Sequence, residues 1–466
     1  MLMRNILLLV AMTLLRLSSA AAQTAAGDQW PESGAAANPD TRPERWNVYY
    51  QATSIGQTHG TFRSPYEGAN SLQDCEERDV SLTTTIFFGL RLDRNTQIYF
   101  DPEIAGGRGL SGVTGIANFP NGEMPRVSGA TPTPYLARLY LTHDFGFGTE
   151  KETVASGPNQ LAGERPATRY TVSIGRFTVT DFFDNNRYSH DPRTQFMGWG
   201  VMVNGAWDYP ADTRGYTWGW VHEFHTRRWS LRYASVAEPK IANGMRFDRR
   251  LFRDRGDVFE GEARYSLGGR AGALRLLSYL NHTHSGSYAD AIRLAGGTGE
   301  VPDVTAVRRT GTLKYGFGLN LEQEVARNVG VFARLGWNDG KTESFAFTAI
   351  DRLASAGVSV SGAGWKRPFD TVATAVTVSG LSGVHAQYLA RGGLDFLIGD
   401  GALRYGPEYV SETYYTARLL PGFFATFDLQ HVTNPAFNRD RGPLWIPSVR
   451  LHVEIGTNTF SRKARS

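Results

Sequence analysis

The sequence predicts an all-β protein, a closed antiparallel transmembrane β-barrel of about 16 strands, or about 18 as the alternative count, with long external loops. Three observations lead to this fold class. Short stretches of alternating apolar and polar residues recur along most of the chain, as strands with one buried face require. The chain combines 52 Gly and 12% aromatic residues with only 41% hydrophobic residues, which suits strands that place half of their side chains in lipid. The N-terminal residues have the pattern of an export signal.

Residues 1–22 are predicted to be a cleaved signal peptide. Arg4 supplies the positive charge, residues 6–15 form a short apolar run, and three alanines precede Gln23. Cleavage there removes Arg4 and Arg16 and lowers the formal net charge of the 466-residue chain from +4 to +2. A protein this close to neutrality has no strong electrostatic attraction for nucleic acid, so no nucleic-acid partner is expected.

No later segment is a continuous apolar run of about 18 residues, so no transmembrane helix is predicted. A chain that crosses a membrane without helices must close its strands into a barrel, because lipid offers no hydrogen-bond partner to open strand edges. The single cysteine, Cys75, excludes an internal disulfide and a cysteine-based metal site. The predicted organisation is a signal peptide (1–22), a mobile N-terminal arm (23–44), a barrel (45–456) and a C-terminal tail (457–466).

Period-two patterning predicts the individual strands. In the second stretch, Leu82 and Ile86 share an apolar face opposite Thr83 and Thr85. The candidate strands lie at 46–58, 79–91, 95–104, 135–145, 168–177, 197–207, 215–224, 228–237, 257–267, 271–283, 311–323, 328–338, 342–349, 372–380, 408–418, 422–433 and 445–455. In the seventh of these, Tyr216 is assigned to the apolar face together with the tryptophans that follow it.

This set holds an odd number of strands, whereas a bacterial single-chain barrel has an even number. The tight turns at 92–94 and 225–227 are separated by an odd number of strands and so would fall on opposite ends of the barrel. One segment between them is therefore miscounted, and the loop-rich region 178–214 is the expected place. Long connections are predicted at 59–78, 105–134, 178–196, 238–256, 284–310 and 350–371, and a short helix within 385–398.

Several motifs have simpler explanations than a functional site. Residues 107–112 satisfy G-x-G-x-x-G, but no helix follows to hold a pyrophosphate, so a loop is predicted. His222 and His225 point to opposite faces of a strand and cannot share a metal. His282 and His284 share a face but lack a third nearby ligand.

Carboxylate pairs such as Asp181 with Asp184, or Glu260 with Glu262, raise the alternative of a glycosidase. Such an enzyme needs two carboxyls about 5–10 Å apart across a bound sugar, a separation that sequence does not provide. Pore constrictions also place acids beside bases, which creates a field that sorts solutes, and this interpretation is preferred.

The stretch 175–221 differs from the rest of the chain. It begins and ends with strand-like alternation, and its middle is dense in polar groups. These are Asp181, Asp184, Asn185, Asn186, His190, Asp191, Arg193, Trp207, Asp208, Asp212 and Arg214. Turn formation explains part of the set, because Asn and Asp bond their own backbone, but it does not explain the accompanying arginines and tryptophan. Planar donors, carboxylate acceptors and an aromatic face together suit hydroxyl-rich solutes.

The sequences GRFTVTDFFDNN, HDPRTQF and NGAWDYPADTRGYTWG in this stretch resemble the carbohydrate-selective porins of the OprB type. The resemblance extends from about Trp46 to Ile455. It includes residues 77–79, 99–103, 406–408, 428–430, 434–435 and 440–443. It implies an outer-membrane barrel of about sixteen strands that passes sugars through an eyelet of charged and aromatic residues. One departure is the C-terminus, where GTNTFSRKARS replaces the aromatic terminal residue usual in outer-membrane barrels.

The predicted function is therefore passive, carbohydrate-selective diffusion of small sugars through an outer-membrane porin into the periplasm. Lumen candidates from strand alternation are Arg138, Arg169, Glu262, Arg264, Lys314, Arg334 and Glu454. Candidates from the stretch 175–221 are Asp181, Asn185, Asn186, Asp191, Arg193, Trp207, Asp208 and Arg214.

No catalytic residue, cofactor or metal is implied. The expected partners are the transported sugars and outer-membrane lipid, and a homo-oligomer is compatible with the sequence but not indicated by it. Three alternatives stay open: a non-selective porin, a carbohydrate-active enzyme on a barrel scaffold, and a barrel with a plugged lumen.

Overall fold

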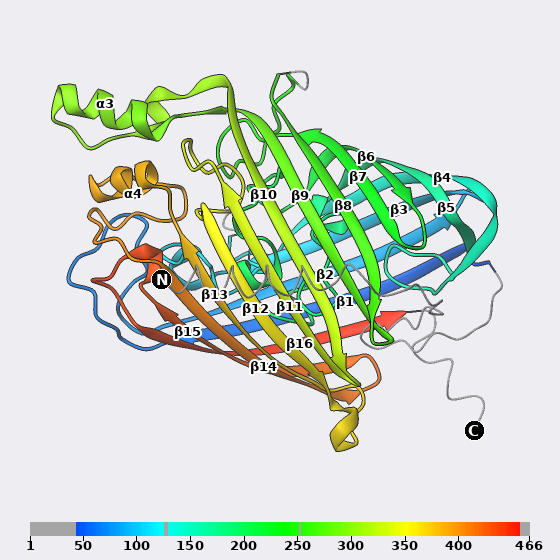
Figure 1. Ribbon diagram of the computed structural model, residues 1–466. Coiled ribbons are helices and arrows are strands. Elements are labelled where there is room, and N and C mark those ends of the chain that lie inside the picture. The colour runs from blue at the N-terminus through cyan, green and yellow to red at the C-terminus, as the bar shows by residue number, and fades with distance from the viewer. Residues whose placement is uncertain (1–42, 125–128, 251–252, 457–466) are drawn as a thin grey trace.

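Sixteen antiparallel strands close into one barrel in the computed structural model, which describes residues 43–124, 129–250 and 253–456 (Figure 1). Each strand pairs with its neighbours in sequence, and β1 (Trp46–His59) pairs with β16 (Leu444–Gly456) to close the ring. The other strands are β2 (Glu77–Arg91), β3 (Thr96–Gly107), β4 (Thr133–Val154), β5 (Gly163–Phe177), β6 (Thr217–His225), β7 (Trp229–Ala237), β8 (Arg255–Leu267), β9 (Arg270–Ser285), β10 (Arg309–Ala326), β11 (Val329–Asn338), β12 (Arg352–Ser361), β13 (Thr371–Gly380), β14 (Glu408–Leu420) and β15 (Phe423–Thr433). The predicted fold class and the preferred strand count are confirmed.

The helical elements all lie in the connections between strands. They are η1 (Leu110–Gly112), η2 (Val179–Asp181), α2 (Trp199–Met202), α3 (Tyr288–Thr298), η3 (Val304–Val307), η4 (Gly362–Trp365), α4 (Gly383–Ala390) and η5 (Pro435–Phe437). Within the described residues, none of these helices has the length and apolar character needed to cross a membrane. The predicted signal peptide, the tail 457–466 and all but the last two residues of the predicted arm lie outside the described residues.

Alternation along each strand separates an outer face from an inner face. In β8, Phe259 and Tyr265 are exposed on the outer face, whereas Glu260 and Glu262 are buried on the inner face. The outer face is thus the apolar surface that meets lipid, and the inner face is polar, as in other outer-membrane barrels.

A substitution on the outer face tests this assignment. Val376 lies in the middle of β13 and is 57% exposed. Val376→Arg is expected to lower the free energy of unfolding in a bilayer by about 2 kcal/mol, because a charge near the bilayer midplane is poorly solvated. Leu420→Arg, at the end of β14 beside a short turn, is the control and should cost less than about 1 kcal/mol. Urea titrations in lipid vesicles measure both free energies of unfolding. Equal losses in the two variants would contradict the assignment of the outer face.

The two ends of the barrel differ in the length of their connections. Turns such as 226–228, 268–269 and 327–328 are short, whereas every connection at the other end is long, including those that carry α3 and α4 (Figure 1). Outer-membrane barrels have short periplasmic turns and longer extracellular loops, so the long-loop end faces the cell exterior.

Two predicted strands are wrong, and both fold into the barrel as loop. Segment 197–207 contains the short helix α2, and segment 342–349 belongs to the connection between β11 and β12. Both alternate in sequence because their apolar side chains are buried, but they pack inside the barrel, against other loops and the inner wall, and not against lipid. With 197–207 removed from the count, the turns at 92–94 and 225–227 lie at the same end of the barrel, as the even strand number requires.

One strand was missed because its two faces differ little in hydrophobicity. β12 consists mainly of Ala, Gly, Ser and Val (RLASAGVSVS), and the sequence assigned it to the long connection 350–371. It pairs without interruption with β11 over residues 352–360 and with β13 over the whole strand. The predicted short helix within 385–398 is present as α4, which begins two residues earlier.

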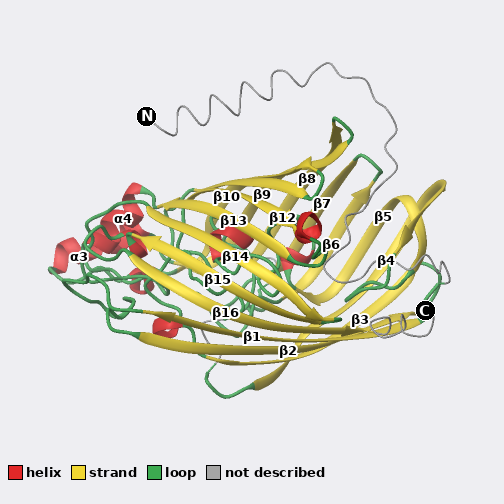
Figure 2. Ribbon diagram, turned by 90° about the horizontal axis from the view of Figure 1, so that it is seen from below, coloured by secondary structure: helices red, strands yellow, loops and turns green. Residues whose placement is uncertain are grey.

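Loops fold into the interior of the barrel (Figure 2). Their apolar side chains, together with inward-facing ones of the strands, form an inner apolar cluster. Trp199 stacks on Phe119 with ring centroids 4.8 Å apart and lies 5.7 Å from Phe347. Trp207 packs against Tyr209, at 5.4 Å. Loops far apart in sequence thus share one core inside the ring of strands, which holds them in a fixed arrangement.

A second cluster joins three extracellular connections through His385 of α4. Its Nδ1 lies 3.0 Å from a carboxylate oxygen of Asp351 and its Nε2 lies 3.2 Å from Asp395. The ring stacks on Tyr288 at 4.3 Å, and the Tyr288 hydroxyl donates to Asp395 at 3.1 Å. Burial alone would lower the pKa of His385, but the two carboxylates outweigh it and raise the pKa to about 9. The imidazolium is therefore the charge that holds these connections together.

Candidate functional site

The connection between β5 and β6, residues 178–216, folds into the barrel, and we call it the constriction loop. Arg334 of β11 fixes its centre. The guanidinium donates to the carboxylate of Asp184 at 3.1 and 3.2 Å and to the carbonyl oxygens of Val201 at 2.8 Å and Ser189 at 2.6 Å. The Arg334 side chain is fully buried, so this ion pair positions the loop and has no surface open to a solute.

Residues 192–198 of the constriction loop are held by β14 and β16. The backbone N–H groups of Met197 and Gly198 donate to Glu412 of β14 at 2.5 and 2.9 Å. Arg450 of β16 donates to the carbonyl oxygens of Pro192 at 2.8 Å and Gln195 at 2.7 Å. Anchors on both walls show that the loop crosses the lumen.

Two glycines of the wall allow the loop to approach closely at Asn204. A Cβ atom at Gly318 of β10 would lie 2.4 Å from the Asn204 side chain, and a Cβ at Gly336 of β11 would lie 2.0 Å from it. These distances are far below van der Waals contact, so any larger residue at either position would displace the loop.

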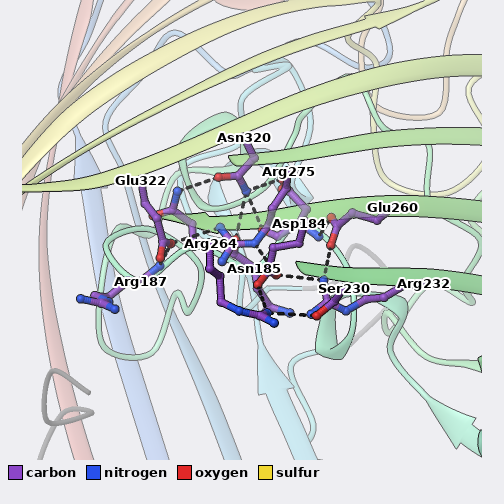
Figure 3. A network of polar contacts seen from close by, with 12 residues as sticks. Asp184, Asn185, Arg187, Ser230, Arg232, Glu260, Arg264, Arg275, Asn320 and Glu322 are labelled. Carbon is purple, nitrogen blue, oxygen red and sulfur yellow. Dashed lines mark hydrogen bonds and ion pairs between the residues drawn. The ribbon is translucent and has the colours of Figure 1, made fainter. Parts of the chain in front are cut away.

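A network of charges covers the inner wall of β7 to β10 beside the loop (Figure 3). Arg232 bridges Glu260 at 2.8 Å and Glu262 at 2.9 Å, and Arg275 continues the series to Glu322 at 3.2 Å. The loop joins this network because the Asp184 N–H donates to Glu260 at 2.7 Å.

The same network extends through further contacts from the loop and from β8. The Arg187 N–H donates to Glu322 at 2.7 Å. Arg264 pairs with Glu262 and donates to Ser230 at 3.0 Å. Asn186, another predicted site residue, donates to Asn320 at 2.7 Å.

A second charged group faces the first across the loop, on β3 and β4. Arg138 donates through Nε and one Nη to the two carboxylate oxygens of Asp181, both at 2.7 Å, and lies 3.4 Å from Asp101. Asp181 is fixed because it ends the turn η2 and accepts a bond from the Thr178 N–H at 3.4 Å. The Arg138 and Asp181 side chains are 12% and 26% exposed, so this pair is open to the lumen.

Arg193 and Arg214 of the constriction loop complete this group. Arg193 bridges Glu103 at 3.0 Å and Glu123 at 2.7 Å. The Arg214 guanidinium lies 4.1 Å from the ring centroid of Tyr135, which is cation–π contact. We call Glu103, Tyr135, Arg138, Asp181, Arg193 and Arg214 the eyelet cluster.

The structure distributes the sequence-predicted residues over three places. Arg138, Asp181, Arg193 and Arg214 meet in the eyelet cluster, and the Asp191 carboxylate accepts from the Arg193 N–H at 2.9 Å. The charged network of β7 to β10 and the loop beside it contain Asn185, Asn186, Glu262 and Arg264. Near the periplasmic end, the sequence-predicted residues are Arg169, which pairs with Glu152, and Glu454, whose N–H donates to the turn residue Gly422.

The remaining predicted residues are fully buried. Asp208 accepts from the N–H groups of Phe345 and Ala346 at 2.8 and 2.7 Å and pairs with Lys314 at 3.1 Å. Trp207 lies in the inner apolar cluster. These side chains, like Arg334, hold loops in place and have almost no solvent-accessible surface.

Some residues of the site escaped prediction. Tyr216 was assigned to the lipid face, but it precedes β6 and its hydroxyl donates to Glu103 inside the barrel at 3.2 Å. Glu103 lies on the same face of β3 as Asp101, and the sequence alternation that places both inside the barrel could have identified it. Tyr135 and Arg232 carry no comparable signal, because only the fold brings them beside the loop.

A family model described as the carbohydrate-selective porin, OprB family, matches residues 81–455. The chain belongs to this family. A search of curated proteins finds no match. OprB-family membership and the barrel fold identify an outer-membrane porin, that is, a channel, and locate the chain in the outer membrane.

The fold is shared with one solved porin structure at a TM-score above 0.5. The high-pH structure of Pseudomonas putida OprB is similar with a TM-score of 0.65 and 15% identity, over 88% of this chain and 94% of that one. The low-pH structure of the same protein gives a TM-score of 0.45 and 12% identity, over 87% and 92%. The outer membrane channel DcaP of Acinetobacter baumannii gives 0.44 and 8%, over 88% and 97%.

Proposed function

We propose that this porin passes small sugars passively and selects them at the eyelet cluster. The observation that carries the proposal is the juxtaposition of Arg138, Asp181 and Arg214 with the ring of Tyr135 at the constriction loop. Guanidinium groups donate to vicinal hydroxyls, carboxylates accept from them, and a tyrosine ring offers an apolar face to the sugar ring. The family description, carbohydrate-selective porin, supports the same solute class.

Binding in the eyelet cluster must stay weak for solute to leave. Most of its charges are already paired: Arg138 with Asp181, and Arg193 with Glu103 and Glu123. A sugar therefore exchanges one set of hydrogen bonds for another of similar strength, which favours passage over retention.

The test is liposome swelling with the purified mature chain, comparing glucose, a disaccharide, an amino acid and a size-matched neutral polyol. Faster swelling with sugars than with the polyol is expected. Arg214→Ala should lower the sugar-to-polyol ratio by roughly threefold, since one net hydrogen bond is at stake. Among the described residues the Arg214 guanidinium makes no hydrogen bond, so its removal leaves no carboxylate unpaired.

Arg94→Ala, an exposed arginine in a periplasmic turn, is the matched control and should leave the ratio unchanged. Equal swelling rates for all solutes would contradict selectivity and leave a general porin. The enzyme alternative makes a different prediction: Asp181→Asn would abolish sugar turnover, whereas in a pore it changes flux only by degrees. Absence of swelling from inserted, folded protein would favour the plugged-barrel alternative.

A further inference from the structure

The connection between β7 and β8, residues 238–254, places its charges unevenly. From residue 238 to residue 257 the sequence carries six basic and four acidic side chains. All four acids, which are Glu238, Asp248, Asp254 and Asp257, are buried. Arg246, Arg249, Arg250 and Arg253 are exposed. The surface of this connection is therefore more basic than its composition suggests.

The buried acids fix one of the exposed arginines of this connection. Arg250 pairs with Asp248 at 2.6 Å and Asp254 at 2.9 Å, and it donates to Thr310 of β10 at 3.0 Å. Within the described part of the chain, the guanidinium groups of Arg249 and Arg253 make no hydrogen bond or ion pair. Guanidinium groups that have no protein partner among the described residues, one on each side of the ion-paired Arg250 in sequence, are suited to bind phosphate.

The height of this surface matches the outer membrane interface. Arg255, on the outer face of β8, lies twelve residues from Leu267 at the periplasmic turn. With a rise of about 3.3 Å per residue and a tilt of about 40°, that distance is roughly 30 Å along the membrane normal. The apolar band of an outer-membrane barrel is about 25 Å tall, so Arg255 lies just above it, at headgroup level, with the loop beyond.

Below the basic surface, the outer wall is hollowed. A groove of about 460 Å³ surrounds Gly261 and is lined chiefly by Tyr170, His222, Leu231, Tyr233, Phe259 and Leu276. A Cβ at Gly261 would meet only Leu231, at 3.7 Å, so the absence of a side chain at this position leaves the groove open. Its volume is within the range of small-molecule sites, and its apolar lining suits an acyl chain.

We propose that this wall binds a phosphorylated, multiply acylated saccharolipid of the outer leaflet, of the lipid A class. Phosphates would lie against Arg249 and Arg253, and an acyl chain would lie in the groove at Gly261, roughly 20 Å lower along the strand. A second copy of the chain fits less well, because a two-fold contact through this surface would bring the same unpaired arginines together. The inference is independent of which solute passes the pore.

The test uses the mature chain in phosphatidylcholine nanodiscs with added bisphosphorylated lipid A, followed by native mass spectrometry of retained lipid. The double variant R249Q/R253Q is expected to weaken retention by about fivefold for each arginine. Gly261→Leu, whose Cβ has room at this position and whose side chain would occupy the groove from the lipid side, is expected to weaken retention several-fold by a separate route. The double variant R94Q/R228Q removes two exposed arginines from periplasmic turns and should retain lipid A as the wild type does.

Lipid A without its phosphates should be retained no better than phosphatidylcholine, and phosphatidylglycerol only weakly. Unchanged retention in R249Q/R253Q, or equal retention of the dephosphorylated lipid, would overturn the proposal. So would a change in oligomeric mass without a change in bound lipid, which would assign the surface to contacts between copies. Heat-modifiable migration in gels checks that each variant is folded.

Discussion

Arg334→Ala is expected to release the constriction loop and to raise both the mean conductance and the current noise of single channels. The Arg334 side chain has no exposed surface, and it satisfies a buried carboxylate and three loop carbonyl groups at once. Removing one partner of a buried ion pair costs about 3–5 kcal/mol, because the charge left behind is neither solvated nor paired. The Asp184 carboxylate would then draw water in and separate the loop from β11.

Planar bilayer recordings measure this effect directly, with thermal unfolding as the second readout. Arg227→Ala is the matched control, since Arg227 pairs with Glu150 at the surface, where both side chains are more than half exposed. Such exposed pairs contribute little to stability, so conductance and noise should stay at the wild-type level. Wild-type conductance and noise in Arg334→Ala would show that Glu412 and Arg450 hold the loop without it.

The contact between the extracellular connections is expected to depend on pH through His385. The folded pKa of about 9 lies above the ordinary value of 6.5, so the imidazolium contributes stability that is complete below pH 6.5. That contribution declines as pH rises and is lost above pH 9. A shift of this size corresponds to a free energy on the order of 3 kcal/mol at low pH.

Spin labels on α3 and at the C-terminal end of α4 measure the contact, for example at Leu294 and Arg391, with the exposed native Cys75 replaced by serine. The distance distribution should be narrow below pH 6.5 and broad above pH 9. In His385→Gln the distance distribution should be broad at every pH, because a neutral side chain leaves Asp351 and Asp395 facing each other without a cation. His431→Gln, on the outer wall of β15, is the control and should keep the wild-type pH dependence. A narrow distribution above pH 9 in the wild type would contradict a charge-held contact.

Sequence patterning predicted the strands of the barrel wall far better than the loops that fold inside it. Fifteen of the sixteen strands were predicted because one face of each meets lipid, which imposes contrast at every second residue. β12 lacks that contrast, since small residues occupy both of its faces. Segments 197–207 and 342–349 show the reverse error: alternation reports burial of one face, and a loop packed in the inner apolar cluster is buried as well.

The candidate site was predicted in its parts but not in its connections. Arg138, Arg193 and Arg214 could be chosen because burying a charge inside a protein is unfavourable. A charged side chain on a lumen face or in the stretch 175–221 therefore indicates a function. Their partners come from β3 and from other loops, and no local pattern records which wall the constriction loop meets. For the same reason Trp207, chosen as an aromatic face for sugar, is a core residue, and the ring beside Arg214 belongs to Tyr135.

The close approach of Asn204 to Gly318 and Gly336 limits how this channel can be re-engineered. Grafting another porin's loop into residues 178–216 would carry over the chemistry of the eyelet but not the flat wall that receives it. A graft with a bulkier residue at position 204 would clash with the wall at these two glycines, and a graft lacking the amide would leave that room empty. Loop and wall are therefore one transferable unit, so a chimera should exchange β10, β11 and the constriction loop together.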